Sequence, residues 1–256
     1  MTPSQLEKGD AFRALHEGEP FVIPNPWDAG SAQALAKLGF QALASTSGGF
    51  AGTLGRSDGE VSLDEVAEHA RALDEATDLP VSMDLENGYG PEPADAAAAI
   101  ARVAAAGAVG GSIEDWDPNG GFIYELGHAA GRVAAAAEAA RAVDFPFTLT
   151  ARAENHLRSN PDLDDTIRRL QAYEAAGADV LYAPWLRTDE EIRAVCAAVS
   201  KPVNVLVMPE MSMEQITAAG AQRVSLGSQL WHVGSGAAMA AASRIRESGD
   251  FSVLSR

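Results

Sequence analysis

Apolar residues recur along the chain in two alternating patterns. Short β-rich runs are followed by longer alanine-rich segments with apolar positions at helical spacing, and this alternation occurs eight times. The runs predict strands at 21–24, 41–45, 80–85, 110–114, 147–152, 179–183, 203–207 and 223–227. The longer segments predict helices at 29–38, 62–77, 93–106, 127–143, 162–176, 188–199, 212–219 and 229–246. Eight such units favour a (β/α)8 TIM barrel over an open doubly wound sheet.

Turn and capping residues support these boundaries. Ser62 and Glu65 are spaced as a capping box, and Pro93 suits the first turn of a helix. Three predicted helices end in the same Ala-Gly-Ala sequence, centred on Gly107, Gly177 and Gly220. Glycine readily adopts the left-handed conformation that ends a helix, so each of these sequences is expected to turn the chain into the next strand.

The composition fits one domain with an acidic surface. The chain has 256 residues, of which 46% are hydrophobic, and no linker or low-complexity segment divides it, so a single barrel domain over residues 1–256 is expected. The formal net charge of −17 opposes binding to nucleic acid or to an anionic membrane. The sequence shows neither a signal peptide nor an apolar run of about 18 residues, so we expect a cytoplasmic protein.

Polar residues concentrate at the predicted carboxyl ends of the strands, where the active sites of (β/α)8 barrels lie. These residues are Asp28, the run 45–49, Asp84, Glu86, Glu114, Asp115, Arg152, Glu154, Tyr182, Asn204 and Ser228. Polar side chains distributed at random would not occupy nearly every strand end. The sequence therefore predicts a functional site at this end of the barrel.

Three carboxylates form the first candidate constellation. Asp84 and Glu86 close one apolar strand, a Gly-Tyr-Gly turn follows, and Glu114 closes the next strand. Carboxylates that converge on one pocket repel each other unless a cation or a proton intervenes, and hard divalent cations prefer oxygen ligands. The cluster therefore indicates a Mg²⁺-like ion. The alternative is that these side chains cap the turn around Gly88 and Gly90.

Two further features suit an anionic substrate. The run 45–49, Ser-Thr-Ser-Gly-Gly, offers hydroxyls and accessible backbone N–H groups, although an ordinary βα turn has the same composition. Arg152 ends an apolar strand, where a guanidinium suits bidentate recognition of a carboxylate or phosphoryl group. The alternative for Arg152 is an internal salt bridge to Glu154, Glu114 or Asp115.

The connection from Trp116 to Gly131 is long for a βα loop. It contains the sequence Asp-Pro-Asn-Gly-Gly, whose glycines can act as hinges, and it resembles a mobile lid. Tyr124, Glu125 and His128 are its candidate proton donors or acceptors. Glu125 and His128 have an alternative role at the start of the following helix.

Residues that the chain lacks at strand ends disfavour several mechanisms. Lys8, Lys37 and Lys201 are the only lysines, and Lys201 precedes the seventh predicted strand, so no strand end offers a Schiff-base lysine. Cys196 is the only cysteine and lies on a predicted helix, which disfavours a disulfide, a thiolate-rich zinc site and a thiol nucleophile. P-loop and dinucleotide fingerprints are absent as well. Metal-assisted electrostatic catalysis is therefore favoured.

In order and spacing, these motifs resemble the isocitrate lyase and phosphoenolpyruvate mutase superfamily. The resemblance runs over residues 20–245 and is carried by 24–28 with 31–32, the run 45–49, Asp58, 84–90, 113–115 and 151–154. It implies a (β/α)8 barrel that binds Mg²⁺ (or Mn²⁺). It also implies action on small α-keto or 2-hydroxy carboxylates through an enolate-like intermediate.

The resemblance implies roles for individual residues. Asp84 and Glu86 would hold the metal, directly or through waters, with Asp58 and Glu114 in support. The substrate carboxylate would bind a set formed by Ser45, Ser47, Gly48 and Arg152, to which we add Asn204 at its strand end. Family members are commonly dimers or tetramers that exchange the last helix. Residues 229–246 are therefore candidates for exchange between the subunits of a homo-oligomer.

The predicted lid departs from the family pattern. Family lyases carry a lid rich in Lys and Cys, with the Cys as general acid, and phosphonate mutases carry a lid Lys and Asn, whereas residues 117–124 read Asp-Pro-Asn-Gly-Gly-Phe-Ile-Tyr. Tyr124 is therefore the candidate acid, beside Arg152 and Glu114 as the other candidate catalytic residues. The leading prediction is a Mg²⁺-dependent lyase that cleaves a carbon–carbon bond in a small di- or tricarboxylate. The alternatives are phosphonate C–P mutase or hydrolase chemistry, and a barrel that binds carboxylates without turnover.

Overall fold

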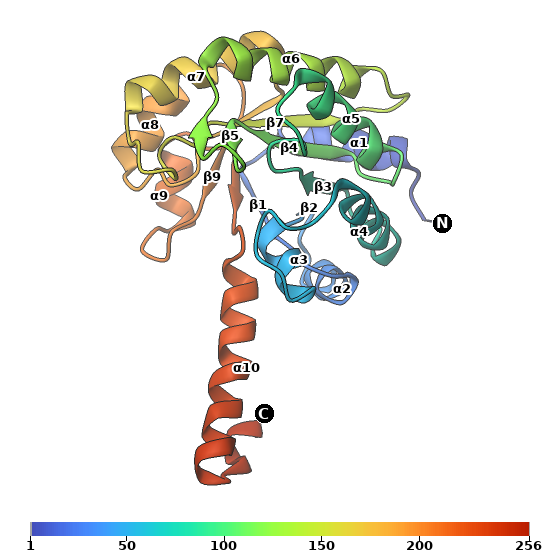
Figure 1. The fold of residues 1–256 in the computed structure, drawn as a ribbon, viewed down its shortest axis with the longest axis vertical. Coiled ribbons are helices and arrows are strands. Elements are labelled where there is room, and N and C mark those ends of the chain that lie inside the picture. Colours follow the sequence, from blue (N-terminus) through green and yellow to red (C-terminus); the bar gives the residue numbers. More distant parts are fainter. Residues whose placement is uncertain (1, 256) are drawn as a thin grey trace.

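Eight parallel strands form the centre of the protein (Figure 1), whose computed structural model describes residues 2–255. The strands are β1 (Phe21–Ile23), β2 (Leu43–Ala44), β3 (Val81–Asp84), β4 (Gly110–Glu114), β7 (Thr148–Arg152), β8 (Val180–Tyr182), β9 (Val203–Leu206) and β10 (Arg223–Ser225). They pair in the order β1-β10-β9-β8-β7-β4-β3-β2. The Ala44 N–H donates to the Pro24 carbonyl at 3.1 Å and so links the two outermost strands. The predicted (β/α)8 barrel is confirmed.

Helices surround this barrel, and each of the predicted ones is present. They are α2 (Ala29–Lys37), α4 (Leu63–Ala76), α5 (Pro93–Ala104), α6 (Leu126–Arg141), α7 (Leu163–Ala176), α8 (Asp189–Ala198), α9 (Met213–Ala218) and α10 (Gln229–Ser248). The structure adds α1 (Gln5–Leu15), α3 (Ser47–Thr53) and the 3₁₀ helix η1 (Phe251–Leu254), which the pattern did not predict. Phe12 of α1 packs with Phe21, Ile23 and Val109. Phe21 begins β1, and Val109 directly precedes β4. Helix α1 therefore covers the amino-terminal end of the barrel.

The capping signals act as predicted. Ser62 and Glu65 form a reciprocal capping box at the start of α4, and Pro93 is the first residue of α5. The φ angles of Gly107, Gly177 and Gly220 are 108°, 107° and 109°, in the left-handed region that glycine tolerates best. These glycines therefore end their helices and direct the chain into β4, β8 and β10.

The run 45–49 differs from the expected βα loop, because helix α3 begins within it. Thr46 caps this helix, and its Oγ1 accepts a hydrogen bond from the Gly49 N–H at 3.3 Å. Two adjacent glycines weaken the local helix propensity, so sequence periodicity gave no sign of α3. The helix directs the Ser47 N–H toward the carboxyl end of β3, where it donates to Asp84 Oδ2 at 3.3 Å.

The connection from Trp116 to Gly131 contains a small hairpin. Its strands β5 (Trp116–Asp117) and β6 (Phe122–Ile123) pair antiparallel, and α6 begins three residues after β6 ends. Glu125 caps α6 by accepting from the N–H groups of Gly127 and His128. The alternative role of Glu125 and His128 at the start of a helix is therefore confirmed, while lid motion stays a prediction.

Helix α10 projects away from the barrel (Figure 1), and none of its residues is buried. Its base contacts the barrel through Trp231, whose ring centroid lies 5.7 Å from that of Trp27. The rest of the helix carries exposed apolar side chains, including Val233 at 68% and Met239 at 65% exposure. Across residues 2–255, no helix combines the length and hydropathy needed to cross a membrane.

Candidate active site

A cavity of about 190 Å³ opens among the carboxyl ends of the strands. Its lining includes Ser45, Ser47, Asp58, Asp84, Arg152 and Asn204, each of which the sequence analysis placed in the site. An adjoining hollow of about 340 Å³ adds Glu86 and Glu114. A larger cavity of about 610 Å³ lies at the opposite end of the barrel and includes Lys201. This position agrees with the prediction for a residue that precedes a strand. The converging acidic and serine residues identify the smaller cavity as the candidate site.

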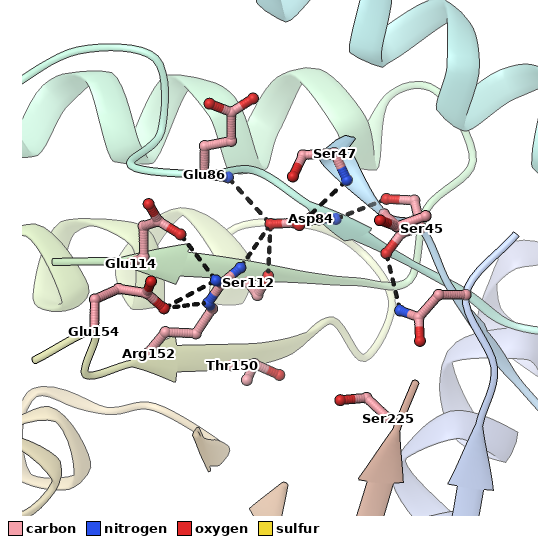
Figure 2. A network of polar contacts seen from close by, with 12 residues as sticks. Ser45, Ser47, Asp84, Glu86, Ser112, Glu114, Thr150, Arg152, Glu154 and Ser225 are labelled. Carbon is pink, nitrogen blue, oxygen red and sulfur yellow. Dashed lines mark hydrogen bonds and ion pairs between the residues drawn. The ribbon is translucent and has the colours of Figure 1, made fainter. Parts of the chain in front are cut away.

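Asp84 stands at the centre of this cavity's polar contacts (Figure 2). Its Oδ1 accepts from Arg152 NH1 at 2.9 Å and from the Glu86 N–H at 3.3 Å. Its Oδ2 accepts from the Ser47 N–H, and its own N–H donates to Ser45 Oγ at 2.8 Å. Groups from β7, from α3 and from the turn after β3 therefore converge on one carboxylate, while Ser45 holds the backbone of the same residue.

Arg152 joins the carboxylates of three chain segments. Besides Asp84, its guanidinium contacts Glu114 Oε2 at 3.0 Å and Glu154 Oε1 at 2.9 Å, and its side chain is only 12% exposed. The predicted internal salt bridge is therefore present with Glu114 and Glu154. Asp115 lies apart from it and pairs with Arg169 at 3.0 Å. These contacts hold the guanidinium in one orientation at the cavity wall (Figure 2).

Gly48 permits a close approach beside the cavity. A Cβ atom at this position would lie 3.0 Å from Ser228 Oγ and 3.5 Å from the Asp58 carboxylate. A larger residue would push against one of these groups. Gly48 therefore needs to be small at this position, and its role in substrate binding stays a prediction.

The carboxylates raise one another's pKa values. Burial, followed by repulsion from Asp84 and Asp58, raises the pKa of Glu86 to about 8. Burial and repulsion from Glu154 raise the pKa of Glu114, although the Arg152 guanidinium opposes this shift. Negative charge at the site is thus incompletely compensated by the side chains around it. A bound cation would supply the missing compensation.

The donor set fits a hydrated divalent cation. Within the described part of the chain, no three His, Cys, Asp or Glu side chains gather closely enough to bind a metal by themselves. Mg²⁺ often binds proteins through one or two carboxylates and keeps several waters. Asp84 and Glu86, from the cavity and the hollow beside it, offer carboxylates for such an ion.

Tyr124 lies outside these two hollows. Its side chain is 3% exposed, and its hydroxyl accepts from Asn87 Nδ2 at 3.1 Å. The Arg132 guanidinium stacks over its ring at 4.6 Å. Proton donation to a substrate would require the 116–123 hairpin to move, so the role of Tyr124 stays a prediction.

Arg158 is a residue of the acidic cluster that the sequence did not predict. This residue follows β7, pairs with Glu114 at 3.5 Å and Glu154 at 3.6 Å, and stacks over the Trp116 ring at 4.5 Å. Its spacing of four residues from Glu154 was the available signal. Arg158 therefore links the acidic cluster to the first strand of the hairpin.

The floor of the cavity is polar, which the sequence patterns did not predict either. Ser82, Ser112, Arg223 and Ser225 lie within strands and contribute to the lining. Polar residues alternating with apolar ones inside these short strands were the available signal, because alternate strand residues face the interior of a barrel. Most barrels of this class fill that interior with branched apolar side chains.

The fold and the acid–arginine site define a class of (β/α)8 enzymes, and comparison with known proteins identifies the family. The family model described as phosphoenolpyruvate phosphomutase matches residues 12–246, so the chain belongs to this family. The 2-methylisocitrate lyase of Halalkalibacterium halodurans is 31% identical over 228 residues, which are 86% of this chain and 74% of that protein.

Solved structures agree with this assignment. A crystal structure from Burkholderia cenocepacia J2315, provisionally described as a lyase/mutase, has a TM-score of 0.94 and 48% identity over 97% of this chain and 91% of that chain. An oxaloacetate acetylhydrolase solved with its product oxalate has a TM-score of 0.86 and 25% identity, over 95% and 88% of the two chains. The predicted superfamily and the prediction of an enzyme are confirmed.

Proposed function

We propose that this enzyme is a Mg²⁺-dependent lyase that cleaves a carbon–carbon bond in a small 2-hydroxy or α-keto di- or tricarboxylate. The observation that carries the proposal is the convergence of Arg152, Ser45 and Ser47 on Asp84 in a cavity of about 190 Å³. This volume is below the roughly 300–1,000 Å³ of sites for drug-sized ligands, so it suits a small molecule. The relative named 2-methylisocitrate lyase supports the same reaction class.

In this proposal Asp84 and Glu86 hold Mg²⁺ (or Mn²⁺), with Asp58 and Glu114 in support. A cation bound there would supply positive charge to stabilise the negative charge that develops on the substrate's α-oxygen. Its affinity depends on ionised carboxylates, so the raised pKa of Glu86 makes binding of the ion release protons near neutral pH.

The chain's own groups bind and orient the substrate carboxylate. The Ser45 hydroxyl and the backbone at Gly48 offer hydrogen bonds, and Asn204 offers an amide at the cavity wall. The Ser47 N–H, which donates to Asp84 at 3.3 Å, would be shared with the substrate. Glu114 and Glu154 orient the Arg152 guanidinium from the side away from Asp84. Tyr124 is the proposed proton donor after movement of the hairpin.

Phosphonate C–P chemistry is the second candidate. The family description, phosphoenolpyruvate phosphomutase, favours it. Such a reaction would place a phosphonate at Ser47 and Gly48 and would change the phosphorus NMR spectrum. A phosphonate carries more negative charge than a carboxylate and would need more positive charge at the site. Arg152 already pairs with three carboxylates of the protein, which disfavours this candidate.

A homo-oligomer, dimer or tetramer, is part of the proposal. Exposed Val233 and Met239 lie on α10, which makes no buried contact with its own barrel beyond its base. We propose that residues 229–246 exchange between subunits and pack on a partner barrel. Met239→Glu should then shift the mass measured by light scattering toward a smaller species, whereas an unchanged mass would place this side chain outside the interface.

The experiment that tests the function is combined proton and phosphorus NMR with Mg²⁺. The panel is isocitrate, 2-methylisocitrate, 2,3-dimethylmalate, oxaloacetate, phosphonopyruvate and phosphoenolpyruvate. Conversion of a carboxylate without a phosphorus change supports the lyase, and conversion of a phosphonate supports the second candidate. No conversion across the panel would favour a substrate outside it or a carboxylate-binding barrel without turnover.

A further inference from the structure

Arg223 places a guanidinium in the interior of the barrel, at the floor of the candidate site. The residue begins β10, is 5% exposed and contributes to the cavity lining. Its Nε–H donates to Asn204 Oδ1 at 2.8 Å, and NH2 donates to Thr150 Oγ1 at 3.0 Å. NH1 lies 3.1 Å from His16 Nε2. The guanidinium is thus held from β9, from β7 and from α1 with its following turn.

All of these partners are electrically neutral. His16 Nδ1 lies 2.8 Å from the Phe12 carbonyl and donates to it, which leaves Nε2 to accept from Arg223. Burial and the neighbouring Arg223 charge lower the pKa of His16 to about 3, so the imidazole is neutral near pH 7. Burial lowers the pKa of Arg223 to about 10, and this side chain therefore keeps its charge.

Among residues 2–255, the charge of Arg223 has no counter-ion. Within residues 2–255, no Asp or Glu oxygen lies within 4.0 Å of its guanidinium. Burial of such a cation is unfavourable when no anion compensates it, because the charge loses its hydration. Arg152 differs sharply, because Asp84, Glu114 and Glu154 already surround it.

The geometry also leaves donors free for a ligand. A guanidinium has five N–H groups, and the three contacts with Asn204, His16 and Thr150 use one on each nitrogen. One N–H on NH1 and one on NH2 remain. Two such donors are what a carboxylate accepts in a bidentate pair. Thr150 and Ser225 lie below Asp84 in Figure 2, and Ser225 lines the same cavity as Arg223.

We propose that Arg223 determines substrate specificity by binding a second carboxylate of the substrate at the barrel floor. This inference rests on the proposed function for the first carboxylate, which binds near Ser47 and Arg152. It assigns one residue, Arg223, to the second carboxylate of the small 2-hydroxy or α-keto acid proposed above. Acids with one carboxylate lack the group that would compensate Arg223.

Malate and lactate form a matched pair of probes for this inference. Both are 2-hydroxy acids, and malate has a carboxylate where lactate has a methyl hydrogen. We expect the wild-type protein to bind malate more tightly than lactate by roughly 10- to 100-fold, the factor for hydrogen bonds to a charged group. Calorimetric titrations with Mg²⁺ and with EDTA measure this ratio.

Arg223→Gln is the test variant, because glutamine retains hydrogen bonding to the surrounding neutral groups without the charge. It should weaken malate binding to the level of lactate and leave lactate binding unchanged. Arg102→Gln is the control, since Arg102 forms an exposed pair with Asp64 and lies outside the cavity. A merely structural Arg223 would change the affinity for both acids together, and that result would overturn the inference.

Two further outcomes separate this inference from the proposed function. A wild-type protein with no preference for malate, including one that binds neither acid, would overturn the role of Arg223 even if it converts a substrate of the panel. A preference that depends on Arg223 in a protein that converts nothing would support the specificity role and contradict the proposed lyase. The melting temperature of Arg223→Gln should stay within a few degrees of the wild type, because its removal also relieves the buried charge.

Discussion

Arg152→Met should destabilise the protein strongly, because it leaves several enclosed carboxylates without their cation. The guanidinium contacts Asp84 at 2.9 Å, Glu114 at 3.0 Å and Glu154 at 2.9 Å. Removing one partner of a buried ion pair costs about 3–5 kcal/mol. At about 2–4 °C per kcal/mol for a chain of this length, the melting temperature should fall by roughly 6–20 °C.

The loss should also depend on pH. In the metal-free protein, burial and Glu154 already raise the pKa of Glu114, and removal of Arg152 raises it further. A carboxylate with a higher pKa in the folded than in the unfolded state favours folding at low pH, and this contribution is lost as the pH rises through the interval between the two values. The destabilisation caused by Arg152→Met should therefore be larger at about pH 8 than at about pH 5.5.

Urea unfolding followed by circular dichroism in EDTA measures both effects. Arg158→Met is the matched control, because Arg158 is 34% exposed and its contacts with Glu114 and Glu154 are longer, at 3.5 and 3.6 Å. It should lose much less stability than Arg152→Met. Equal losses in the two variants, or a loss in Arg152→Met that is the same at both pH values, would refute the reasoning.

The remaining predictions concern the cation and the proposed acid. The pKa of Glu86 rises from 4.5 to about 8 in the fold, so the metal-free protein should lose stability between those pH values as the pH increases. Mg²⁺ at a hundredfold excess over its dissociation constant should restore about 2.7 kcal/mol at pH 8, measured by urea unfolding, and should do nothing for Asp84→Asn. Tyr124→Phe should lower kcat by about 100-fold or more with little change in KM. A wild-type kcat with a lower melting temperature would show that the hydroxyl only stabilises the fold through its hydrogen bond with Asn87.

Much of the fold could be predicted from sequence, because each βα unit carries its own local signals. The capping box at Ser62 and the left-handed turns at Gly107 and Gly177 depend on residues within a few positions of one another. Helix α3 was not predicted because its glycines lower the local helix propensity. Its capping residue, Thr46, lies in a run of small polar residues that is equally typical of a loop.

Apart from Asp58, which the family resemblance supplied, the candidate site could be predicted where its residues lie at or just after strand ends. Asp84, Glu114 and Arg152 close their strands, and parallel strands in a barrel bring such ends together. Arg223 begins its strand, and the first residue of a strand lies at the end of the barrel away from the active site. Its position in the sequence therefore gave no indication of a place in the site. Its long side chain reaches Thr150 across the interior, and that reach depends on the closure of the whole sheet.

The most direct test of the proposed lyase is the Mg²⁺ dependence of carbon–carbon cleavage, followed by proton NMR on the carboxylates of the panel. Wild-type protein should convert at least one of them with Mg²⁺, lose this activity in EDTA and regain it when Mg²⁺ is restored. Asp84→Asn should remain inactive with Mg²⁺ while keeping the circular dichroism spectrum of the wild type. Equal conversion by Asp84→Asn, or equal conversion by the wild type in EDTA, would contradict the account.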